Sequence, residues 1–139
     1  MAKNPETKVT DDLKTALSSC GGYFMKVSDS YSRGIPDSFI AVPQGLWAVE
    51  IKVDRTKGTL CTRTYKSLGA SGAQDHRLRQ VARVAKGHAY IFTNTVDLDR
   101  PILWSPVNPE REGEGFEDYM RIADGWESVL FLMGFTGGL

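Results

Sequence analysis

The segment 46–53, with the sequence LWAVEIKV, constrains the fold more than any other part of the chain. A β-strand points successive side chains to opposite faces. One face of this strand therefore carries large hydrophobic residues: Trp47, Val49, Ile51 and Val53. The other face brings Glu50 and Lys52 out side by side. Such a strand is expected near the centre of a sheet, with its hydrophobic face buried.

A helix and two further strands are predicted before this segment. Pro5 suits a first helical turn and Cys20-Gly21-Gly22 suits a helix end, so we expect a helix over residues 5–19. Its hydrophobic stripe consists of Val9, Leu13, Ala16 and Leu17. Aromatic and β-branched residues then predict strands over 23–27 and 38–42. The break Pro43-Gln44-Gly45 makes a hairpin of the second of these and 46–53.

The segment 54–73 is rich in basic, Thr, Ser and Gly residues without a clear period, which indicates a long mobile loop. Residues 72–86 then predict a helix that is hydrophobic on one face and basic on another. Residues 88–93 predict another strand. A strand, a helix and a strand in this order imply parallel pairing through a right-handed crossover. The predicted class is therefore α/β, or α+β with a mixed sheet.

The C-terminal part predicts an extension to this core. We expect a short edge strand at 102–104 and then a connection rich in Pro, Gly and Glu. Hydrophobic residues follow at helix-like intervals: Phe116, Met120, Ala123, Trp126, Leu130 and Met133. They predict a helical segment that covers the sheet or pairs with a second subunit. We accordingly divide the chain into a core, 1–99, and an extension, 100–139.

Length and composition fit one water-soluble domain. The chain has 139 residues, of which 41% are hydrophobic and 24% charged, and no hydrophobic run is long enough to span a bilayer. The first ten residues resemble neither a secretory signal nor a transit peptide, which predicts a cytoplasmic protein. Isolated cysteines and histidines indicate neither a disulfide framework nor zinc or histidine chemistry: Cys20, Cys61, His76 and His88.

The charge is unevenly distributed although the formal net charge is zero. Residues 52–86 hold nine basic residues against two acidic ones, a net of +7, whereas the residues after 99 hold three against seven, a net of −4. A basic middle and an acidic tail suggest one surface for a polyanion and one turned away from it. A solvated charged face explains the same pattern equally well.

Asp37 brings a second carboxylate to the Glu50 strand. If Val42 faces Leu46 across the turn, Asp37 falls opposite Ile51 and beside Glu50. Two adjacent carboxylates repel each other unless a cation lies between them. Oxygen ligands of this kind favour Mg²⁺ or Mn²⁺. The sequence therefore predicts a divalent metal site at this point.

Metal-assisted hydrolysis of a phosphodiester needs a cation, a positioned water and positive charge near the reacting phosphate. Asp37 and Glu50 supply ligands for the cation, and Lys52 supplies the positive charge. The backbone carbonyl of Ile51 and the carboxylate of Glu6, on the first helix, are candidates for further ligands.

At these residues the sequence resembles the PD-(D/E)XK nuclease superfamily, and specifically its compact VRR-NUC branch. The matching motifs are Gly34-Ile35-Pro36-Asp37, Glu50-Ile51-Lys52 and Ser71-Gly72-Ala73-Gln74. The resemblance covers roughly residues 6–94. It implies a restriction-endonuclease-like αβββαβ core, a divalent metal held by Asp37 and Glu50, Lys52 beside the attacking water, and Gln74 supporting the site. It also places Glu6 at the acidic position of the first helix. The segment between Lys52 and Ser71 is longer than in compact relatives.

Each of these residues also has a structural interpretation. Asp37 after a proline suits a turn, and Glu50 with Lys52 suits an exposed strand. Ser71 and Gln74 form a capping box at a helix start, and Glu6 suits the first turn of a helix. The order and context of the motifs favour the functional interpretation for Asp37, Glu50 and Lys52.

The prediction is a Mg²⁺- or Mn²⁺-dependent endonuclease that cuts DNA, selective for branched or junction structures, in recombination or repair. The residues expected to contact DNA phosphates are Arg55, Lys57, Arg63, Lys66, Arg79 and Arg83. A homodimer would present two sites to two strands. So compact a nuclease suits a phage genome and the host cytoplasm. The alternatives are a catalytically silent, nuclease-fold DNA-binding or inhibitory subunit, and an interaction module centred on the acidic C-terminal segment.

Overall fold

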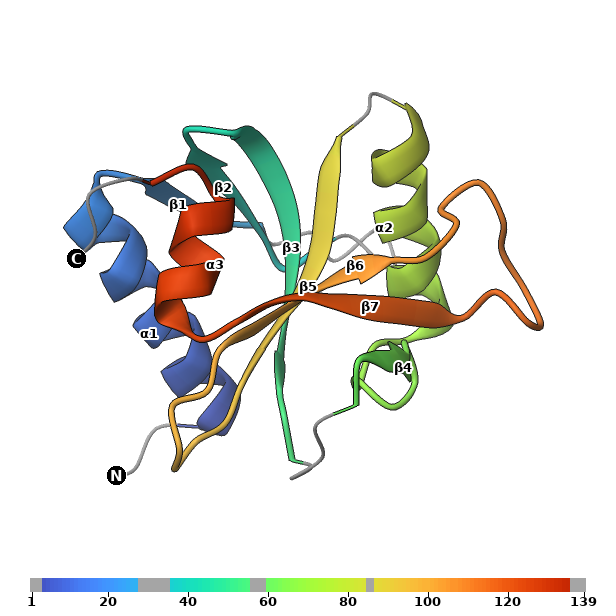
Figure 1. Ribbon diagram of the computed structural model, residues 1–139, viewed down its shortest axis with the longest axis horizontal. Helices are drawn as coiled ribbons and strands as arrows, with labels where there is room; N and C mark the ends of the chain where they lie inside the picture. Colours follow the sequence, from blue (N-terminus) through green and yellow to red (C-terminus); the bar gives the residue numbers. More distant parts are fainter. Residues whose placement is uncertain (1–3, 28–35, 56–59, 85–86, 136–139) are drawn as a thin grey trace.

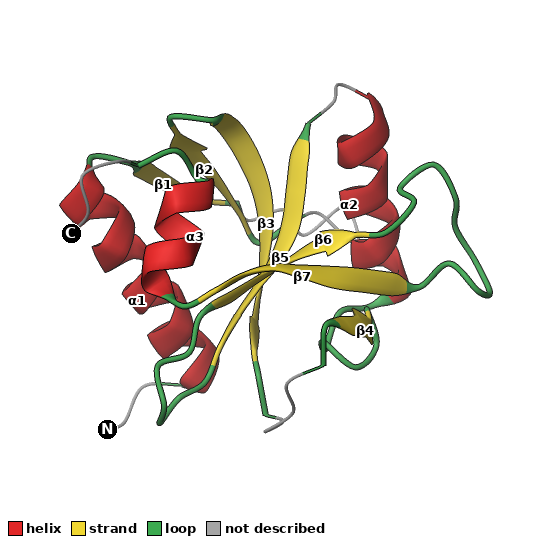
Figure 2. Cartoon of the chain, in the orientation of Figure 1, coloured by secondary structure: helices red, strands yellow, loops and turns green. Residues whose placement is uncertain are grey.

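A single sheet runs through the molecule with helices on both of its faces (Figure 1). The computed structural model describes residues 4–27, 36–55, 60–84 and 87–135. Within them the elements are α1 (Pro5–Cys20), β1 (Tyr23–Lys26), β2 (Ser38–Val42), β3 (Gly45–Val53), β4 (Thr62–Thr64), α2 (Gly72–Val84), β5 (His88–Asn94), β6 (Ile102–Pro106), β7 (Asp118–Asp124) and α3 (Trp126–Leu132). Helices α1 and α3 lie beside one face and α2 beside the other (Figure 2).

The sheet has seven strands in the order β1-β2-β3-β5-β6-β7-β4. Strands β3 and β5 are parallel and joined through α2, while the other neighbours are antiparallel. This arrangement confirms the predicted class, a mixed sheet with an αβββαβ core. It also confirms the parallel crossover predicted between residues 46 and 93.

Helix α1 forms as its sequence predicts and ends one residue later. The side chain of Asn4 accepts a hydrogen bond from the Glu6 N–H at 2.8 Å, and Pro5 occupies the first helical position. At the other end Gly21 has φ 85°, a left-handed conformation that glycine adopts without strain. The buried stripe of Val9, Leu13 and Leu17 faces the sheet.

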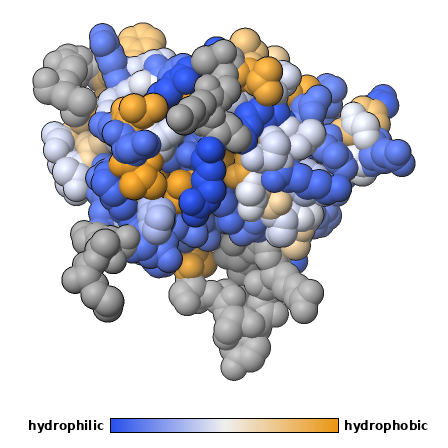
Figure 3. Space-filling view, turned by 90° about the horizontal axis from the view of Figure 1, so that it is seen from below, coloured by the Kyte–Doolittle hydropathy of each residue, from blue (hydrophilic) through white to orange (hydrophobic). Residues whose placement is uncertain are grey.

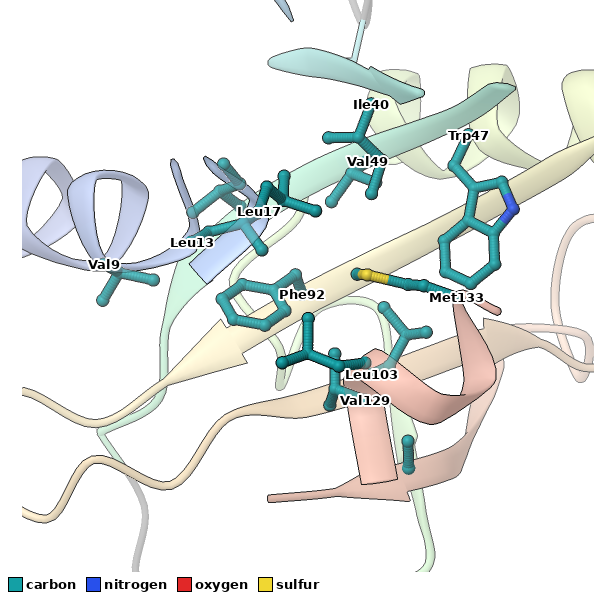
Figure 4. Close-up of a cluster of buried hydrophobic side chains, with 13 residues drawn as sticks. Val9, Leu13, Leu17, Ile40, Trp47, Val49, Phe92, Leu103, Val129 and Met133 are labelled. Atoms are coloured by element: carbon teal, nitrogen blue, oxygen red, sulfur yellow. The ribbon is translucent and has the colours of Figure 1, made fainter. Parts of the chain in front are cut away.

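Two hydrophobic clusters lie on the two faces of the sheet. The first joins α1 and α3 to the sheet, and Figure 4 shows its side chains converging between the helices and strands: Val9, Leu13, Leu17, Ile40, Trp47, Val49, Ile51, Phe92, Leu103, Ala123, Val129, Leu130 and Met133. The second joins α2 and the segment after β4 to the other face: Ala48, Leu68, Ala70, Leu78, Ala89, Ile91, Ile102, Trp104 and Tyr119. Burial on both faces explains why the central strands are so hydrophobic.

The C-terminal part differs from the prediction. Strand β6 pairs with both β5 and β7, so it is internal rather than an edge. The segment expected to be one helix from Phe116 to Met133 is strand β7 followed by the short helix α3. The buried residues of β7, Tyr119 and Ala123, are four positions apart, and that spacing puts residues on one face of a strand as well as of a helix. The spacing therefore did not distinguish the two.

The prediction of a loop over residues 54–73 is also wrong in part. Residues 62–64 form β4, which pairs antiparallel with β7, and Leu68 and Ala70 are buried in the second cluster. Three residues with the sequence TRT carry no strand pattern of their own, because the pairing partner lies more than fifty residues later in the chain. Among the described residues, no helix is long and hydrophobic enough to cross a membrane.

Candidate active site

The register of the β2–β3 hairpin places Asp37 opposite Glu50. Val42 pairs with Gly45, so the turn contains two residues, and every pair is one position away from the prediction. Gly45 has φ 132°, which suits glycine and lets it join the strand directly after the turn. The predicted partner of Asp37, Ile51, is therefore wrong by one residue, and Asp37 lies opposite Glu50 instead.

Two backbone hydrogen bonds fix these carboxylates. The N–H of Asp37 donates to Oε2 of Glu50 at 3.1 Å, and the N–H of Ile51 donates to Oδ2 of Asp37 at 3.1 Å. Each acid is thus held by the backbone of the strand that carries the other. In a strand the N–H and C=O of one residue point to the same side. The carbonyl of Ile51 therefore faces the same side as its N–H, toward Asp37.

Glu50 is completely buried, at 0% exposure. Burial raises the pKa of this carboxyl to about 8, and the nearby charge of Asp37 adds to the effect, while Lys52 opposes it. The side-chain amide of Gln74 donates to Oε1 of Glu50, and Nζ of Lys52 lies 3.4 Å from the same oxygen. The protein thus holds a buried acid next to a second one, an arrangement that a cation would relieve.

Lys52 is positioned by the segment that follows β4. Its side chain is 19% exposed. Its hydrocarbon stem passes close to Gly69, where an added Cβ would lie 3.7 Å from the Cδ of Lys52. The ammonium group is therefore presented at the site on a stem that is packed against the protein.

Gln74 makes both of the contacts considered for it. The N–H of Ser71 donates to Oε1 of Gln74 at 2.8 Å, and the N–H of Gln74 donates to Oγ of Ser71 at 3.1 Å, which is a capping box. The same side chain uses its amide nitrogen to reach Glu50. The start of α2 is thereby tied to the candidate site.

A buried polar network anchors α2 beside the sheet. Arg79 is 0% exposed and donates from Nε to Oδ1 of Asp75 at 2.9 Å, an oxygen that also accepts from the Tyr119 hydroxyl at 2.8 Å. Its other nitrogens donate to the carbonyls of Val107, Asn108 and Asp118. The prediction that Arg79 contacts phosphate is therefore wrong, because its guanidinium is enclosed and its hydrogen bonds are made within the protein.

The other residues predicted to contact DNA lie in differing surroundings. Arg63 is 8% exposed at its side chain and is bonded to Asp54 and to the carbonyl of Ser67. Arg83 pairs with Glu112 at 2.8 Å. Arg55 is exposed, and Lys66 is 69% exposed at its side chain. Lys57 lies outside the described residues. Arg55 and Lys66 are therefore the exposed members of this set, and Nζ of Lys66 lies 4.0 Å from Oε1 of Glu117.

A cavity of about 360 Å³ opens beside Asp37, between α1 and β1. Glu6, from the first turn of α1, lines it together with Asp37 and Ile51. The donor set at this end fits a hard divalent cation, because carboxylate and carbonyl oxygens are its preferred ligands. Within the described part of the chain, no group of three or more His, Cys, Asp or Glu side chains is close enough to hold a metal by itself. Any ion here would need the backbone carbonyl or water to complete its shell.

Two lysines that sequence reasoning did not select, Lys14 and Lys26, line the same cavity. Both precede the basic segment 52–86. The helical spacing of Lys14 from Glu6, and the place of Lys26 at the end of its strand, would have indicated this face.

Solved structures with a similar fold include a VRR_NUC domain and a Holliday junction resolvase. A VRR_NUC domain superposes with a TM-score of 0.51 at 20% identity, covering 68% of this chain and 88% of that one. Hjc, a Holliday junction resolvase from the archaeal hyperthermophile Archaeoglobus fulgidus, superposes with a TM-score of 0.56 at 14% identity, covering 92% of this chain and 99% of its own. No protein-family model and no curated protein matches the sequence.

The chain therefore has a VRR-NUC and resolvase-like nuclease fold, as its motifs predicted. At these identities the likeness is one of fold. The chemistry of a protein depends on its site rather than on its fold.

Proposed function

We propose that the protein is a divalent-metal-dependent endonuclease that hydrolyses DNA phosphodiester bonds. The observation that carries this proposal is the pairing of Asp37 with the buried Glu50, with the ammonium of Lys52 3.4 Å from the second carboxylate. A structural role alone gives no reason to bury an acid beside another acid, because such a pair costs stability.

Each residue has a distinct role in this proposal. Asp37, Glu50 and the Ile51 carbonyl would hold Mg²⁺ or Mn²⁺, with Glu6 reaching the same cavity from α1. When bound, the ion would polarise the phosphate and lower the pKa of a water. Lys52 places positive charge where the pentacovalent phosphate develops negative charge. Gln74 orients Glu50 by its hydrogen bond.

The proposed substrate is branched DNA. Hjc, which shares the fold, is a Holliday junction resolvase. We further propose a homodimer, since two symmetric sites can address two strands of a junction.

The test is cleavage of a labelled four-way junction, a flap and a linear duplex in Mg²⁺ or Mn²⁺, with EDTA as control. The wild type should cut in metal only, with the junction or flap preferred, and Lys52→Ala should lose activity by about two orders of magnitude or more. The variant Lys8→Ala is a matched control. It also removes a partly exposed lysine, but one that is paired with Asp12 away from the site. Absence of cutting in every metal, with DNA still bound, would instead support the silent binding subunit.

A further inference from the structure

We propose that the cavity between α1 and β1 binds a single unpaired DNA strand leading away from the scissile phosphate, with Lys26 and Lys14 holding successive phosphates. This inference rests on the proposed nuclease function and names a feature of its substrate. The protein would then recognise an unpaired DNA segment that adjoins the cleavage position.

The cavity meets the candidate active site at Asp37 and Ile51, which line it, whereas Glu50, Lys52 and Gln74 do not. Helix α1 lines its length from Asn4 to Lys14. Ten residues of a helix extend about 15 Å, which is long enough for one nucleotide and the two phosphates that flank it. Figure 3 shows the molecule from below, where hydrophobic side chains gather beside strongly hydrophilic ones.

The two lysines stand at different distances from the site. Lys26 pairs with Ser38, the residue after Asp37, so it lies near the end of the cavity that Asp37 lines. Lys14 follows Glu6 by eight residues, which is about 12 Å along the helix axis. Its Nζ lies 5.7 Å from the centre of the Phe24 ring, and Phe24 also lines the cavity. Both lysines are exposed and within reach of a ligand.

The size and lining fit one strand rather than a duplex. A space of about 360 Å³ enclosed between a helix and an edge strand holds a nucleotide-sized group but not a double helix. Phe24 gives it a hydrophobic wall, which suits a sugar or an unstacked base. Three carboxylates also line the cavity, those of Glu6, Asp11 and Asp37, so Lys14 and Lys26 supply the positive charge that a phosphate needs beside them.

The test is binding of a fluorescent single-stranded oligonucleotide by the full chain in EDTA, followed by fluorescence anisotropy. For single strands each phosphate contact changes log K by about 0.7 per decade of salt, which is about fivefold between 1 M and 0.1 M. Lys14→Ala and Lys26→Ala should each raise Kd about fivefold at 0.1 M salt and reduce the salt slope by about 0.7. The matched control is Lys8→Ala, on the same helix but beside a different cavity, and it should leave Kd unchanged.

A duplex of the same sequence should be affected less than twofold by either variant. Equal weakening by Lys8→Ala, equal weakening of the duplex, or no change in Lys14→Ala and Lys26→Ala would overturn the inference. Because the assay contains no metal, it is independent of cleavage. A protein that cuts DNA but binds strands normally in both variants keeps the proposed function and loses this inference. The converse result, lysine-dependent strand binding without cleavage, keeps the strand-binding cavity but removes the proposed function and, with it, the scissile phosphate.

Discussion

The buried acid Glu50 should make the metal-free protein less stable as pH rises. Its pKa is raised from 4.5 to about 8 in the folded state, mainly by burial and then by Asp37. A raised folded pKa contributes stability that is fully present below 4.5 and is lost as pH rises through 8. Between those values the unfolded chain has released the proton and the folded chain still holds it.

The size of the effect follows from that window. In it the free energy of unfolding falls by about 1.4 kcal/mol per pH unit. Between pH 5.5 and pH 7.5 the free energy of unfolding therefore falls by about 3 kcal/mol. Solvent does not screen this effect, because the Glu50 side chain is 0% exposed.

Urea unfolding in EDTA at those two pH values measures this loss. The variant Glu50→Gln keeps the shape but cannot ionise, so its stability should change much less over the same range. The difference between the two proteins isolates Glu50 from every other titrating group. Identical pH dependence in wild type and Glu50→Gln would refute the reasoning, since it would mean that Glu50 titrates normally.

Three further predictions concern metal binding, the Arg79 network and the hydrophobic core. Metal binding near pH 7 should release about one proton per chain and tighten toward pH 8, because Glu50 must ionise; calorimetry in buffers of different ionisation enthalpy measures this, and a buffer-independent heat would argue against it. Arg79→Ala should cost about 3–5 kcal/mol by leaving Asp75 unpaired, against about 1 kcal/mol for Tyr119→Phe, in urea unfolding; equal costs would contradict the network. Leu13→Ala should cost about 2–5 kcal/mol, whereas Phe131→Ser, at a residue 72% exposed, should change stability by under about 0.5 kcal/mol.

The central part of the fold was predictable because its signals are local. The alternation in β3, the cap and the glycine that bound α1, and the capping box at α2 are each contained in a few neighbouring residues. The same local patterns put Glu50 and Lys52 on one face. The site residues contributed by β3 therefore followed from the sequence.

What the sequence did not predict depends on contacts between distant segments. Strand β4 exists because β7 pairs with it, and β7 was mistaken for a helix because its buried residues are four apart. The hairpin register depended on whether Gly45 joined the turn or the strand. Arg79 looked like an exposed basic residue, but the carbonyls that enclose it come from residues 107–118.

The pairing of Asp37 and Glu50 as a metal site is tested most directly by Mn²⁺ binding, followed by electron paramagnetic resonance. The wild type should hold Mn²⁺, Asp37→Asn should lose it, and Lys52→Ala should still hold it while failing to cut DNA. Mn²⁺ binding that is unchanged in Asp37→Asn, or DNA cleavage that persists in EDTA, would contradict the account.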